Sequence, residues 1–132
     1  MLRVIYPSPE RIIEYNLLVL ELFRVKKADA AKVLSRTKIR EIIEDCEKKE
    51  GNIYDKAVVL LKGIVQKHPF ASGNRRTSFI ATKDFILKNC SKFGVKDEPG
   101  YAKVMLGVRE DYYSDDEIKE WIKHGNIREF KR

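Results

Sequence analysis

The sequence has few of the features that mark secreted, metal-binding or membrane proteins. Its two cysteines, Cys46 and Cys90, stand far apart and belong to no C-x-x-C pair or His/Cys cluster, so we expect ordinary reduced thiols. No apolar run approaches the about 20 residues that cross a bilayer, and the densest one, Leu17 to Leu20, is followed by Glu21. The N-terminus lacks the basic, apolar and small-residue regions of a signal peptide. These absences indicate a cytoplasmic protein with no membrane partner.

Strand signals and repeats are scarce too. No segment shows sustained alternation of apolar and polar residues between hairpin turns, as a half-buried strand would. The length of 132 residues suits a single domain spanning residues 1–132, since domains commonly have about 100–150 residues. The net charge of +7 favours anionic partners such as nucleotides or nucleic acid. A lysine-rich solvated surface would explain the same charge.

What the sequence does contain is helical patterning. Apolar residues at helical spacing, together with capping residues, predict helices throughout the chain. The expected segments are Ser8 to about Phe23, about Ile39 to Gly51, Ile53–Lys67, Arg75–Asn89, Gly100–Arg109 and Ser114–Gly125. The first helix carries a broad apolar surface that we expect to be mostly buried. We therefore predict an all-α domain, with a short β-hairpin as the one possible exception among residues Lys26 to Ile53.

The loop from His68 to Ser78 joins two helices with strong apolar faces. Its Gly73-Asn74 pair tolerates backbone angles that turn several N–H groups toward one point. The N-terminus of the following helix adds unpaired N–H groups and a partial positive charge. Arg75 and Arg76 add two fixed cations. This combination predicts an anion site, most commonly for phosphate.

His68 stands at the rim of the expected anion site. It follows Ile64 and Val65 at helical spacing, so we expect it to continue the buried face of the preceding helix. A neutral imidazole there can take a proton from an incoming hydroxyl group. Pro69 restricts the loop, and we expect Phe70 to point back into the core and fix it.

This loop resembles the signature of the Fic/Doc (Fido) family, His-Pro-Phe-x-(Asp/Glu)-Gly-Asn-(Gly/Lys)-Arg. Matching positions are His68, Pro69, Phe70, Gly73, Asn74 and Arg76. The tripeptide Arg75-Arg76-Thr77 is similar to the Lys-Arg-Thr of the Doc (death-on-curing) branch. The specific similarity covers about nine residues, which is strong for a short motif.

The resemblance implies a Fido-like helical bundle that transfers AMP or phosphate from ATP, or another nucleotide, to a hydroxyl group of a protein substrate. By matched position, His68 would be the general base. Gly73 and Asn74 would form the anion hole, and Arg76, beside Arg75, would hold a nucleotide phosphate. A Doc-like protein would be the toxin of a toxin–antitoxin pair and would be restrained by a separate antitoxin.

Two positions depart from the family pattern. The acidic residue that holds Mg²⁺ in the family is Ser72 here, and a neutral hydroxyl is a weaker ligand for this cation. Position 79 is Phe79 where the AMP-transferring branch often has a second arginine, which favours the Doc-like branch. The inhibitory Ser/Thr-x-x-x-Glu-(Gly/Asn) helix of many Fic enzymes is also missing, because Ile42 follows Thr37 to Glu41.

Two alternatives to a nucleotidyltransferase or phosphotransferase stay open. The first is a catalytically impaired module that binds a nucleotide or phosphate, which the serine at position 72 makes credible. The second is a helical nucleic-acid-binding protein. Residues Ala28 to Glu44 have some helix-turn-helix character, but they lack the glycine that often marks the turn.

Overall fold

The computed structural model describes residues 3–22, 31–96 and 98–131. Within them the chain forms six α-helices and no β-strand. The helices are α1 Pro9–Leu22, α2 Arg36–Lys48, α3 Ile53–Lys67, α4 Asn74–Lys88, α5 Tyr101–Arg109 and α6 Asp115–His124. The all-α prediction is therefore confirmed. None of these helices is long and apolar enough to cross a bilayer.

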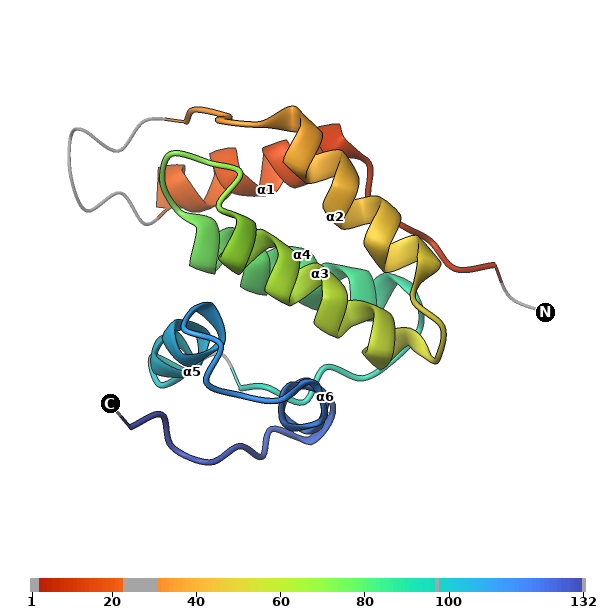
Figure 1. Cartoon of the computed structure of the whole chain (residues 1–132), viewed down its shortest axis with the longest axis vertical. Helices are drawn as coiled ribbons and strands as arrows, with labels where there is room; N and C mark the ends of the chain where they lie inside the picture. The colour runs from red at the N-terminus through yellow and green to blue at the C-terminus, as the bar shows by residue number, and fades with distance from the viewer. Residues whose placement is uncertain (1–2, 23–30, 97, 132) are drawn as a thin grey trace.

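The helices form three layers around a central antiparallel pair, α3 and α4 (Figure 1). Helices α1 and α2 cover one side of this pair, while α5 and α6 cover the other. The chain reverses direction between α3 and α4 in the loop that starts at His68. This loop therefore lies at one end of the central pair, where α1, α4 and α5 come near one another.

Local capping explains where several helices begin and end. The Asn52 side chain accepts from the N–H of Asp55, whose carboxylate accepts from the N–H of Asn52 in return. Ser114 and Glu117 form the same reciprocal pair at the start of α6. Each such reciprocal pair, known as a capping box, satisfies N–H groups that a helix start leaves unpaired. The expected helix at residues 53–67 agrees at both ends, and α4 begins and ends one residue earlier than expected.

The core lies between α3 and its neighbours. Fully buried side chains include Leu60, Leu61 and Ile64 of α3 and Ile86 of α4. Gly63 lets α2 approach α3 closely, because a Cβ atom on Gly63 would lie 2.7 Å from Cγ2 of Ile42. A glycine inside a helix costs about 1 kcal/mol relative to alanine. The close packing of α2 against α3 explains why a glycine stands at position 63 inside a helix.

The expectation that α1 is mostly buried is wrong for one side of the helix. Leu17, Leu18 and Leu22 have 49%, 45% and 63% of their surface exposed. The buried residues of α1 are Ile12, Tyr15, Asn16, Val19 and Leu20. This set is a stripe three or four residues apart, as expected for a helix packed on one side. Phe23, which the sequence analysis grouped with them, lies outside the described residues.

Two further expectations also fail in the described part of the segment between α1 and α3. Residues 31–53 contain no strand, and the only pairing there is an isolated bridge between Val33 and Phe70. The hairpin expected within residues 26–53 is therefore absent from 31–53, and 26–30 lie outside the described residues. The first helix of the suggested helix-turn-helix is likewise not seen at residues 31–34, while 28–30 are not described. Both cysteines are free, with Cys46 buried and Cys90 exposed.

Candidate functional site

His68 ends α3 in a left-handed backbone conformation, with φ 56° and ψ 57°. A non-glycine residue at positive φ is uncommon. The reversal turns His68 away from the helical path, and its side chain is exposed. The expectation that it continues the buried face of α3 is wrong, because that spacing argument holds only while the chain stays helical. Exposure leaves the imidazole accessible to a substrate.

The backbone after His68 is tied to the segment before α2. The carbonyl of Pro69 accepts hydrogen bonds from the N–H groups of Leu34 and Ser35, at 2.8 and 3.2 Å. The N–H of Ala71 donates to the carbonyl of Lys32 at 2.9 Å. Phe70 is fully buried, as expected, so its ring anchors the loop in the core.

Asn74, the first residue of α4, holds the loop with its side chain. Its Oδ1 accepts from the N–H of Phe70 at 3.1 Å, and its Nδ2 donates to the Phe70 carbonyl at 2.8 Å. The residue is 4% exposed. The amide is thus engaged with the loop backbone, and what Asn74 can offer an anion is its main-chain N–H.

A second asparagine, Asn16 of α1, holds the other side of the loop. Its Nδ2 donates to the Ser72 carbonyl at 2.9 Å and to Oγ1 of Thr77 at 3.1 Å. Gly73 lies against α1 with φ 77°, and a Cβ atom there would come within 3.2 Å of Leu20. Asn16 was not among the residues predicted for the site. The sequence feature that could have pointed to Asn16 is a polar residue within the apolar stripe of the first helix.

Helix α4 begins directly after this loop. Gly73 is the N-cap residue, and the first helical bond runs from the Thr77 N–H to the Gly73 carbonyl at 2.9 Å. The N–H groups of Asn74, Arg75 and Arg76 therefore precede the regular hydrogen-bond pattern of the helix. Such a helix end carries about half a positive charge.

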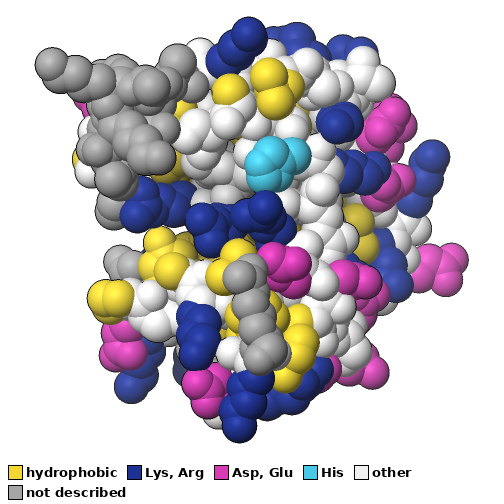
Figure 2. All heavy atoms as spheres, turned by 60° about the vertical axis from the view of Figure 1, so that its left-hand side comes forward, with side chains coloured by type: hydrophobic (Ala, Val, Ile, Leu, Met, Phe, Trp, Pro, Cys, Tyr) yellow, Lys and Arg dark blue, Asp and Glu magenta, His cyan; other side chains and the backbone are white. Residues whose placement is uncertain are grey.

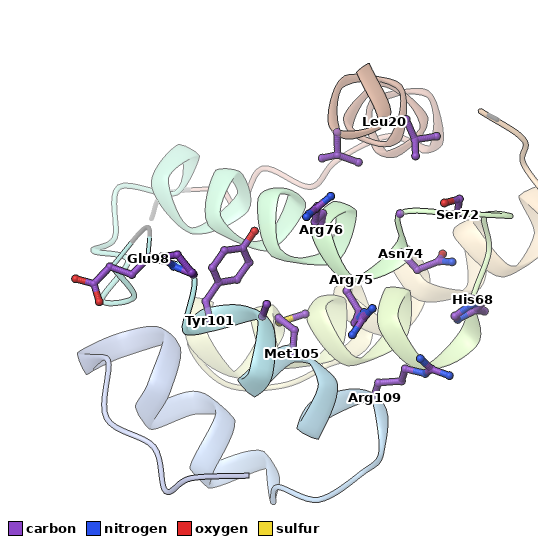
Figure 3. A pocket seen from close by; sticks show the side chains of 14 residues that line it. Leu20, His68, Ser72, Asn74, Arg75, Arg76, Glu98, Tyr101, Met105 and Arg109 are labelled. Atoms are coloured by element: carbon purple, nitrogen blue, oxygen red, sulfur yellow. The ribbon is translucent and has the colours of Figure 1, made fainter. Parts of the chain in front are cut away.

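A pocket of about 720 Å³ opens beside the loop, and we call it the His68 pocket. Its size lies within the range of about 300–1,000 Å³ that small-molecule sites occupy. The loop, the start of α4, the face of α1 near Leu20 and α5 line it (Figure 3). From the expected site the pocket brings together His68, Ser72, Gly73, Asn74, Arg75 and Arg76.

The pocket is strongly basic. Three arginines line it, Arg75 and Arg76 of α4 and Arg109 of α5, against one acid among the described lining residues, Glu98. Figure 3 shows Arg75 on the side of α4 toward α5, Arg109 below His68, and Arg76 on the side toward Leu20. Lys and Arg side chains also form a band beside a histidine on this face of the molecule (Figure 2). Arg109 was missed because its link to the loop exists only in the folded chain.

A sequence model described as the Fic/DOC family matches residues 2–86 of the chain. This span is well over half of the chain, and it includes the whole loop and most of α4. The chain belongs to the Fic/DOC family. No curated protein matches it significantly. Helix α5, with Arg109, lies beyond the part that the Fic/DOC model matches.

The Fic/DOC motif has an acidic residue where this chain has Ser72. In the described residues no group of three His, Cys, Asp or Glu side chains could hold a metal ion. Glu98 lies at the far end of the pocket from Ser72, and its carboxylate points outward (Figure 3). Mg²⁺ is normally held by one or two carboxylates together with substrate phosphates. The described donor groups around Ser72 therefore do not fit a carboxylate-held Mg²⁺.

Phe79 is the second departure from the Fic/DOC pattern, and it is a core residue here. It is 4% exposed and packs against Phe93, Tyr101 and Trp121, with ring centroids 5.4, 4.0 and 6.2 Å away. Tyr101 is also part of the lining of the His68 pocket. Phe79 therefore helps to place α5 against α4, which sets the width of the pocket.

Proposed function

We propose that this Fic/DOC protein transfers AMP or phosphate from a nucleotide such as ATP to a hydroxyl group of a protein. The observation that carries this proposal is one pocket that combines an exposed histidine, a helix N-terminus and three arginines. Each of the three groups matches one need of phosphoryl transfer, namely a base, an anion hole and cations for the phosphate oxygens.

The N–H groups at the start of α4 and the guanidinium of Arg76 bind the phosphate chain. Its transferred phosphorus then lies beside His68. The hydroxyl oxygen of the protein substrate attacks this phosphorus, and His68 accepts the hydroxyl proton. The bond to the leaving phosphate breaks, releasing pyrophosphate when AMP is transferred or ADP when the terminal phosphate is transferred. The side chains of Asn16 and Asn74 keep the loop in place but do not touch the reacting atoms.

Labelled ATP tests this proposal. The protein is incubated with a cell extract and ATP labelled on either the α or the γ phosphate. Protein-bound label from the α position means AMP transfer, and label from the γ position alone means phosphate transfer. His68→Ala should lower the transfer rate by about 100- to 10,000-fold, the usual contribution of a general base. His124→Ala is the matched control, because His124 is an exposed histidine paired with Glu120 on α6.

A binding module is the second candidate, favoured by the serine at position 72. It predicts that the protein binds ATP but that neither label reaches any protein. If His68→Ala instead lost both ATP binding and transfer, His68 would be structural. An antitoxin-like partner is a further proposal for the Doc-like case, and a small neighbouring open reading frame whose product copurifies with this protein would support it.

A further inference from the structure

We propose that the His68 pocket binds the phosphate chain of its nucleotide without a protein-held metal, and that Arg75 and Arg109 supply the positive charge instead. The proposal rests on the proposed function in taking a nucleotide phosphate as the ligand. It assigns to Arg109, outside the family-matched region, a binding role in this site.

The two arginines carry charge that no described residue compensates. Arg11, Arg36 and Arg128 all form ion pairs with nearby glutamates. Among the residues that the structure describes, no ion pair involves Arg75 or Arg109. Both line the pocket beside the helix N-terminus. Like charges gathered in one cleft without counter-ions favour a multiply charged anion.

The position of Arg109 is fixed by the fold. It is the last residue of α5, whose Met105 and Val108 are buried. The side chain of Gln66 on α3 donates to the Val108 carbonyl at 2.9 Å, which holds the end of α5 against α3. Ala102, Met105 and Arg109 follow one another at helical spacing and all line the pocket. One face of α5 thus forms the wall opposite α4.

A structural role is the competing explanation for Arg109. A cation in the last turn of a helix interacts favourably with the helix dipole, and Arg109 is in the last turn of α5. That effect accounts for an arginine at this end of the helix. It does not account for Ser72 in place of an acid, nor for Arg75 on α4, a second arginine that forms no ion pair with a described residue. A polyphosphate bound between the two helices explains all three.

The residue at position 72 determines whether phosphate binding needs a divalent cation. An acid at this position would bring negative charge next to the bound phosphates, and a divalent cation would be needed to offset it. With a serine there, the arginines face the phosphates with no such repulsion. The free nucleotide, which carries more negative charge than its Mg²⁺ complex, is then the better ligand.

Calorimetric titration of ATP tests the proposal, once with EDTA and once with excess Mg²⁺. We expect the wild-type protein to bind at least as tightly in EDTA as in Mg²⁺. Arg109→Gln and Arg75→Gln should each weaken binding in EDTA by roughly tenfold or more, the size of one charge-assisted hydrogen bond. Arg40→Gln is the matched control, since it removes the same charge from an exposed position on helix α2. Inorganic tripolyphosphate should show the same pattern if the phosphates carry the binding.

Ser72→Asp gives the converse test. It should weaken ATP binding in EDTA and make binding depend on Mg²⁺. The proposal is overturned if wild-type binding needs Mg²⁺, or if Arg109→Gln behaves like Arg40→Gln. Binding in EDTA without label transfer would support this inference and contradict the proposed activity. Transfer that requires Mg²⁺ would support the activity and contradict this inference.

Discussion

Replacing Asn74 with alanine removes the side-chain contact that holds the loop after His68 to the start of α4. The side chain of Asn74 makes two hydrogen bonds to the backbone of Phe70, one at each polar group. Phe70 is fully buried, so the change leaves an N–H and a C=O without their partner. The substitution therefore probes how much of the loop geometry depends on this one residue.

The cost follows from those two groups. Each buried polar group that loses its partner costs about 1–3 kcal/mol, so the loss of two partners should lower the free energy of unfolding by about 2–6 kcal/mol. Water entering from the exposed side of the loop would move the value to the lower end. For a domain of this length, each kcal/mol lowers Tm by about 3–5 °C. Losing these two hydrogen bonds should also weaken ATP binding, because the loop would no longer be held in a fixed position relative to the N–H groups at the start of α4.

Urea unfolding followed by circular dichroism measures the first effect, and calorimetry with ATP measures the second. Asn126→Ala is the control, because Asn126 is exposed and makes one long hydrogen bond, at 3.4 Å, to Glu120. A loss of less than about 1 kcal/mol, below the lower bound for even one unsatisfied buried group, would refute the reasoning if ATP affinity also stayed unchanged. The two bonds to Phe70 would then not hold the loop.

Three further changes test other parts of the account. Asn16→Ala should lower the free energy of unfolding by about 1–3 kcal/mol, because the buried Thr77 hydroxyl and the partly buried Ser72 carbonyl lose their donor. It should weaken ATP binding more than an equally destabilising core substitution does. Gly63→Val should cost about 1–3 kcal/mol from overpacking against Ile42, measured by urea unfolding. The side chain of Arg128 and the N–H group of Ser114 lower the pKa of Glu117 from 4.5 to about 2. Its stabilising effect is therefore present above pH 4.5 and lost as pH falls toward 2, and Glu117→Gln should flatten this part of the acid unfolding curve.

The helices were largely predictable because their ends are encoded locally. Gly51-Asn52 and the Pro69 that follows His68 bracket α3, and the helix runs between them as the spacing of its apolar residues indicates. Ser114 with Glu117 defines the start of α6 in the same way. In each case the deciding hydrogen bonds join residues about three apart, so the sequence holds all the information needed.

The details of the site were less predictable because they depend on tertiary contacts. The exposure of His68 follows from one left-handed residue, which apolar periodicity cannot foresee. The inward turn of the Asn74 side chain depends on where the Phe70 backbone comes to lie. Arg109 reaches the pocket only because α5 folds back over α3 and α4. The exposed leucines of α1 show the same limit, since periodicity cannot tell which apolar side finds a partner.

The central claim is that phosphate binds at the start of α4 beside His68. Its most direct test is a nuclear magnetic resonance titration of the labelled protein with ATP, following the backbone amide signals. We predict that the largest shift changes fall on Gly73, Asn74, Arg75 and Arg76, with a smaller change at Arg109. Changes spread over the basic surface elsewhere, or no change at residues 73–76 at saturating ATP, would contradict the account.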